Sequence, residues 1–187
     1  MKRKTGRCVD LAMKMGVVVP LFAALAAGPS HAAGEKNVHL YGSLVAEPCV
    51  IPPGEEEIVL DFGTIIDKTL YRHTRTAGKT FSIHLTECDL SLGNTVKVSF
   101  IGMESTALPG LLAIDGLSQA TGIAIGLETP NEKLLPINAE SEKYRLREGS
   151  NVITLKAYVQ GEPDAITNQS IERGPFSAAA TFSLEYE

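Results

Sequence analysis

The sequence is short of positive charge. Its 187 residues carry 17 Lys and Arg against 22 Asp and Glu, a net charge of −5. Affinity for nucleic acid comes mainly from Lys and Arg, so we expect no nucleic-acid partner. Hydrophobic residues make up 44% of the chain, a share that excludes an intrinsically disordered protein. The length suits one globular domain or at most a small pair.

The sequence also lacks the common motifs of catalysis. It contains no HExxH, GxSxG or SxxK pattern and no glycine-rich phosphate loop. His84 falls opposite the apolar residues of an alternating segment, which favours a solvent-facing side chain over a ligand or a base. The acidic run 55–57 favours a solvated turn, because calcium loops space their oxygen donors apart. We therefore expect no enzyme, no cofactor, no metal and no small-molecule substrate.

The N-terminal residues 1–32 have the order of a secretory signal peptide. A basic start is followed by an apolar run over 15–27, and Ser30 and Ala32 stand where a cleavage site needs small residues. The run has about 13 residues, whereas a membrane-spanning helix needs about 20. An uncleaved anchor remains the alternative. Removing residues 1–32 takes away five basic residues and one acidic residue, which leaves 12 and 21 and a net charge of −9.

Only three cysteines are present, and one of them, Cys8, leaves with the signal. The remaining two, Cys49 and Cys88, are expected to form a disulfide, because exported proteins mature in an oxidising compartment. A pair of metal-binding thiolates is the alternative, but it lacks partner ligands at a workable spacing.

The mature chain alternates apolar and polar residues in short segments separated by turn-forming residues, the pattern of β-strands. No segment of ten or more residues has a helical period. An antiparallel β-sandwich is therefore the expected fold. The strands are predicted at 38–46, 58–62, 80–86, 95–101, 122–127, 152–160 and 177–186.

The two ends of the mature chain are unusual. Before Cys49, a segment alternates like a strand but has Gly42 in its apolar row, where glycine often marks the close approach of another backbone. At the other end, a second alternating row stops one residue before the chain does. We interpret the first segment as a portable strand and the second as a place for such a strand to dock.

In these features the chain resembles the fimbrial subunits of the bacterial chaperone–usher pathway, in particular minor and tip pilins of P-type and type-1-type fimbriae. The resemblance includes the export signal, the N-terminal arm with its central glycine, and the cysteine that follows it. Most specific is the C-terminus, where Gly174 is fourteenth from the end and Tyr186 is the penultimate aromatic residue.

The resemblance implies an incomplete immunoglobulin-like sandwich, a pilin fold that lacks its last strand and is completed by donor-strand exchange. It divides the chain into a signal at 1–32, a donor arm at 33–47 and a pilin domain at 48–187. The donor face of the arm would be Val38, Leu40, Gly42 and Leu44. The acceptor groove, which a chaperone also binds, would be formed by Gly174, Ala178, Ala180, Phe182, Leu184, Tyr186 and Glu187.

The expected partners are a periplasmic pilus chaperone, an outer-membrane usher and neighbouring pilin subunits, and the expected location is a fimbria at the cell surface. We expect a minor tip or adaptor subunit. An assembly terminator or anchor remains an alternative, because only the state of the groove's far end separates it from an extendable subunit. A carbohydrate-binding adhesin is a further alternative, although about 155 mature residues leave no room for a separate lectin domain.

Overall fold

The computed structural model describes residues 38, 40–44 and 46–187 of the chain. Residues up to Gly42 form one unit and residues from Ser43 onward form another, so each is described by itself. The predicted signal at 1–32 lies outside the described residues.

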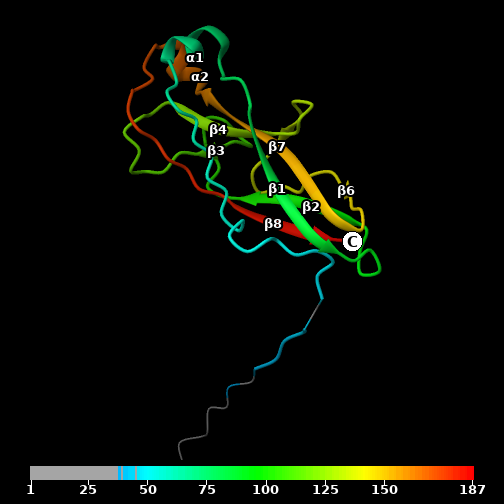
Figure 1. Cartoon of the computed structure of the whole chain (residues 1–187). Helices are drawn as coiled ribbons and strands as arrows, with labels where there is room; N and C mark the ends of the chain where they lie inside the picture. Colours follow the sequence, from blue (N-terminus) through cyan, green and yellow to red (C-terminus); the bar gives the residue numbers. More distant parts are fainter. Residues whose placement is uncertain (1–37, 39, 45) are drawn as a thin grey trace, which may run out of the picture. The chain divides into compact units, whose positions relative to one another are not determined.

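The larger unit is an antiparallel β-sandwich, as the alternation of apolar residues predicts (Figure 1). One sheet has the order β1-β7-β4-β3, with β5 also paired to β4, and the other has the order β6-β2-β8. The strands are β1 Lys79–Cys88, β2 Thr95–Ile101, β3 Leu112–Ala113, β4 Ile123–Glu128, β5 Leu134–Leu135, β6 Tyr144–Arg145, β7 Gly149–Gly161 and β8 Thr181–Tyr186.

The core lies between the two sheets. Ile83 and Leu85 of β1 and Leu155 of β7 point inward from the first sheet, and Val96 and Val98 of β2 point inward from the second. A T-shaped pair between Phe81 and Phe100, with ring centroids 6.1 Å apart, joins the sheets directly. The inward set follows from the period-two alternation of these strands, because successive side chains point to opposite faces.

Two short helices lie together at one end of the sandwich, and the C-terminus lies at the other (Figure 1). The helix α1 spans Asp67–His73 and ends at Thr74, whose left-handed backbone lets its N–H donate to the Leu70 carbonyl. The helix α2 spans Pro163–Thr167 and begins with proline, which has no N–H to leave unpaired at a helix start. Tyr71 of α1 accepts a hydrogen bond from the Ile171 N–H, so the helix end of the domain is tied to the segment that leads into β8.

A buried ion pair fixes the segment after α1. Arg75 donates to the carboxylate of Glu128 over 2.8 Å, and only 1% of the Glu128 side chain is exposed. The Arg75 guanidinium also stacks 4.1 Å from the ring centroid of Tyr158. Gly126 is needed beside that ring, because a Cβ there would lie 2.1 Å from it. This arrangement holds the end of α1 against β4 and β7.

The predicted disulfide is confirmed: Cys49 is bonded to Cys88 at the end of β1. Cys49 is therefore held at the end of the sandwich away from the helices. Pro48 is held there too, since its carbonyl accepts from the Asp89 N–H over 2.7 Å. Any chain preceding Pro48 leaves the domain at this end.

Three details correct or refine the sequence-based expectations. Residues 58–62 form no strand, because no described strand pairs with their backbone. The described residues of the predicted strand 38–46 have no regular structure either. The solvent-facing position of His84 is confirmed, and its Nδ1 lies 2.6 Å from a carboxylate oxygen of Glu55, itself in the exposed acidic turn.

Candidate functional site

The last strand is covered on one side only. The β8 strand pairs with β2 in register, with Leu184 opposite Val98 and Phe182 opposite Phe100. Among the described residues, no strand pairs with its other edge. An unpaired edge presents free N–H and C=O groups to any strand that approaches.

The inward side chains along this strand are also incompletely covered. Exposed and half-buried residues alternate strictly from Phe176 to Tyr186, and none of them is fully buried. We call the half-buried set the acceptor row; it consists of Phe176, Ala178, Ala180, Phe182, Leu184 and Tyr186. Five of these six residues were predicted as groove residues, and Phe176 was not. The row packs against the core from one side and leaves its other side open.

A second half-buried row was not predicted as part of the site. Ile58, Leu60, Phe62 and Ile65 are half-buried and pack against the core, while Val59 between them is 83% exposed. No backbone hydrogen bond joins residues 58–65 to the backbone of any other described residue. Their alternation was visible in the sequence, but alternation predicts only the face on which a side chain lies. It does not identify the segment that packs beside it.

The two rows meet near α1. The rings of Phe62 and Phe176 lie 6.2 Å apart, measured between centroids. Just beyond them is a cavity of about 160 Å³, which we call the end pocket. Its apolar lining comes from segments far apart in the sequence and includes Ile65, Leu70, Ile123, Val159, Ile171 and Phe176.

The predicted groove residue Gly174 lines this end pocket. A Cβ at this position would lie 2.6 Å from the Cβ of Gln119, so only glycine allows the chain to pass so close. The neighbouring Pro175 carbonyl accepts a hydrogen bond from the Gln119 N–H over 2.9 Å. Gly174 thus sets the position of the chain that enters the acceptor row.

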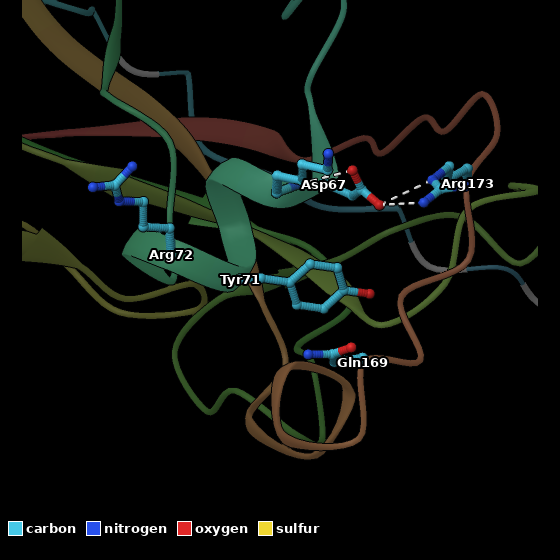
Figure 2. A pocket seen from close by; sticks show the side chains of 6 residues that line it. Asp67, Tyr71, Arg72, Gln169 and Arg173 are labelled. Carbon is cyan, nitrogen blue, oxygen red and sulfur yellow. Dashed lines mark hydrogen bonds and ion pairs between the residues drawn. The ribbon is translucent and has the colours of Figure 1, made fainter.

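An ion pair stands at the rim of the end pocket. Arg173 donates from Nε and Nη2 to one carboxylate oxygen of Asp67, over 2.9 and 2.6 Å. Arg173 holds the pKa of Asp67 below its usual value. Both residues also line a wide, open depression of about 450 Å³ beside α1, where they point toward each other above Tyr71 and Gln169 (Figure 2).

The chain end is pinned to β2. A main-chain carboxylate oxygen of Glu187 accepts from the N–H groups of Asn94 and Thr95, over 2.9 and 3.1 Å. Its side chain forms ion pairs with Lys143 and, over 2.6 Å, with Lys97. These hydrogen bonds, first from Lys143 and then from Lys97, lower the pKa of Glu187 to about 2. Sequence reasoning placed Glu187 at the site but missed both lysines.

The predicted donor residues lie on both sides of the boundary between the two units, and none of them belongs to the acceptor row. Val38, Leu40 and Leu44 are at least 81% exposed, and a Cβ at Gly42 would meet no atom within 4 Å. The structure does not place the arm up to Gly42 against the domain. Their role as a donor face stays a prediction.

Comparison with known proteins decides the family. A family model described as "Fimbrial protein" matches residues 38–187. The chain belongs to the fimbrial protein family. It is 31% identical to the major MR/P fimbria protein of Proteus mirabilis, over 93% of this chain and 98% of that protein. It is also 31% identical to the fimbrial adapter PapK of Escherichia coli, over 89% of this chain and 94% of that protein.

Solved structures agree with this family assignment. The P pilus rod subunit PapA superposes with a TM-score of 0.65 at 25% identity, covering 75% of this chain and all of PapA. The chain is thus a chaperone–usher fimbrial subunit with an immunoglobulin-like pilin fold. Fimbrial proteins are structural components of cell-surface fimbriae, a non-enzymatic class. Within residues 38, 40–44 and 46–187, no helix is long and apolar enough to cross a membrane.

Proposed function

We propose that this fimbrial protein polymerises by donor-strand exchange, in which the N-terminal arm of one subunit completes the sandwich of another. The observation that carries the proposal is the acceptor row, a run of six inward side chains beside an unpaired strand edge. A strand added at this edge would satisfy the free backbone groups of β8 and cover the row. The second half-buried row, Ile58 to Ile65, would cover the other side of the added strand.

The arm has the chemistry for this role. Val38, Leu40, Gly42 and Leu44 are spaced two residues apart, so in an extended strand they share one face. Each large apolar side chain that becomes buried contributes about 1.5–3 kcal/mol. Three such side chains and a full set of strand hydrogen bonds make the link long-lived, with most of its strength in slow dissociation.

The direction of the arm follows from the geometry of the domain. The chain runs from Gly174 and Phe176 at the end pocket through β8 to the chain end, and the arm is attached at Pro48, which lies against Gly93 together with Glu187. If the arm lies antiparallel to β8, its C-terminal part reaches the end pocket, and the donor's body follows at the helix end of the acceptor. Each contact is then head-to-tail, so that subunits add one after another to a filament. In this arrangement Leu44 enters the end pocket.

The end pocket favours an extendable subunit over a terminator. A terminator has a groove that accepts no further arm, whereas here a cavity of about 160 Å³ with an apolar lining stands at the far end. Because the chain has both a donor arm and an accepting groove, we assign it an internal position and favour a minor, adaptor-type subunit. The similarity to PapK and to the putative minor fimbrial subunit PmfF supports this role.

The same open edge requires protection before assembly, because exposed apolar strand edges aggregate. We propose that a periplasmic chaperone covers the acceptor row during export and that an outer-membrane usher is the place of exchange. The division of the chain into a signal at 1–32, a donor arm at 33–47 and a pilin domain at 48–187 is part of this proposal.

The test is an exchange experiment on the purified chaperone–subunit complex. A synthetic arm of residues 34–47 should displace the chaperone, and an otherwise identical arm with Gly42→Leu should not, because a side chain there collides with the acceptor backbone. In cells, Gly42→Leu in the full chain should abolish incorporation into fimbriae while leaving chaperone binding intact. Equal uptake of both arms would remove the assigned role of Gly42, and failure to take up this arm or the arm of any other subunit of the same fimbria would refute the exchange itself.

The position in the fimbria needs a separate measurement. Antibody-gold labelling of assembled fimbriae should mark one site near the tip for an adaptor. Continuous labelling along the shaft would instead identify a rod subunit.

A further inference from the structure

The ion pair between Asp67 and Arg173 belongs to both hollows at the helix end of the domain. The two residues line the apolar end pocket and also the open depression beside α1. A strand that fills the end pocket therefore lies beside this pair. Among the described residues, Lys68, Arg72 and Arg173 line the depression with one acid, Asp67, whereas Glu172 borders the end pocket instead.

The exposure and geometry of the ion pair allow Arg173 to leave it. The Arg173 side chain is 81% exposed, and both of its donating nitrogens contact the same oxygen, Oδ2, of Asp67. The other oxygen, Oδ1, accepts a hydrogen bond from the Lys68 N–H over 2.8 Å at the start of α1. Asp67 is only 16% exposed and keeps this bond if Arg173 turns away. A carboxylate arriving from outside could therefore take Arg173 as its partner.

The arm of a second copy brings such a carboxylate to this place. Glu47 follows Leu44 by three residues, which is about 10 Å of extended chain. With Leu44 in the end pocket and the arm antiparallel to β8, residues after Leu44 run past Phe176 and Gly174 toward Arg173. We propose that Arg173 exchanges Asp67 for Glu47 of the incoming arm, so that the subunit selects arms that have an acidic residue three positions after the side chain in the end pocket. This inference rests on the proposed donor-strand exchange.

The test is a double-mutant cycle between arm and subunit. The probe is a labelled peptide of residues 34–48 with an amidated C-terminus, so that no terminal carboxylate competes with Glu47. After it has replaced the chaperone on the full subunit, its dissociation rate is measured in the presence of excess unlabelled peptide. The variants are Glu47→Gln in the peptide and Arg173→Gln in the subunit. Glu35→Gln in the peptide is the matched control, because it removes the same charge at the opposite end of the arm.

We expect Glu47→Gln to speed dissociation about two- to fivefold from the unaltered subunit, the range of an exposed ion pair. The same change should have no effect on the Arg173→Gln subunit, and the difference should shrink in 1 M NaCl. Glu35→Gln should have no effect on either subunit. A second variant, Asp67→Asn, frees Arg173 and should increase the dependence on Glu47.

Other outcomes overturn the proposal in distinguishable ways. If Glu47→Gln and Glu35→Gln change the dissociation rate equally, or if the effect of Glu47→Gln persists in Arg173→Gln, the arm binds but Arg173 does not recognise Glu47. If no peptide enters the subunit, the donor-strand exchange itself fails and this inference falls with it.

Discussion

The strands β4 and β8 differ in their burial and in the pairing of their edges. All six residues of β4 are buried, and the strand is paired on both edges, with β7 on one side and with β3 and β5 on the other. None of the six residues of β8 is buried, and within the described part of the chain only its edge toward β2 is paired. Three of the β8 residues are polar and face outward, but its apolar residues are as large as those of β4 and are still only half-buried. For this apolar face the difference lies in the missing neighbour.

The largest expected effect on the free energy of unfolding comes from matched side-chain truncations in the two strands. Leu127→Ala in β4 should lower the free energy of unfolding by about 2–5 kcal/mol, because Leu127 is fully packed. Leu184→Ala in β8 should cost under about 1.5 kcal/mol in the domain without an arm, because the side chain is only partly buried. With a bound arm the cost of Leu184→Ala should rise toward that of Leu127→Ala. Urea unfolding of both variants, with and without arm, measures this; equal costs without an arm would contradict the account.

The smallest effect concerns the charges at the ends of the two strands. The β4 strand ends in buried Glu128, paired with Arg75, whereas β8 is followed by exposed Glu187 between Lys97 and Lys143. The two lysines lower the pKa of Glu187 to about 2, so its stabilising effect is complete above about pH 4.5 and is lost as the pH falls toward 2. Glu187→Gln should therefore flatten the loss of stability between about pH 4.5 and 2.

Unfolding in urea across this pH range measures the effect, together with NMR titration of the Glu187 carboxyl group. Glu185→Gln is the control, since Glu185 is an exposed acid only two residues away, in β8. An unchanged acid profile in Glu187→Gln would show that the lysines do not stabilise the chain end.

Sequence patterns predicted the faces of the strands better than their partners. Period-two alternation correctly placed Ile83 and Leu85 in the core and put Phe182, Leu184 and Tyr186 on one face of β8. The same alternation predicted a strand at 58–62. Ile58, Leu60 and Phe62 do turn inward, but no described strand pairs with their backbone. Hydrogen-bond partners depend on a neighbour that the alternation does not identify.

The end pocket could not be predicted in the same way. Its walls come from residues as far apart in sequence as Ile65, Ile123 and Phe176, and only the folded topology brings them together. Gly174 was noticed by its distance from the chain end, whereas its physical reason is the contact with Gln119. The ion pair between Asp67 and Arg173 had no sequence signal at all, because 106 positions separate the two residues.

The most direct test of the account appends the arm to the open edge in the same molecule. Residues 34–47 are fused after Glu187 of the 48–187 domain through a short Gly-Ser turn, which suits an antiparallel neighbour of β8. The fusion should unfold as a monomer whose free energy of unfolding exceeds that of the bare domain by at least about 3 kcal/mol, and Leu40→Asp in the appended strand should abolish most of this gain. A bare domain that is monomeric and as stable as the fusion would contradict the claim that the sandwich is incomplete.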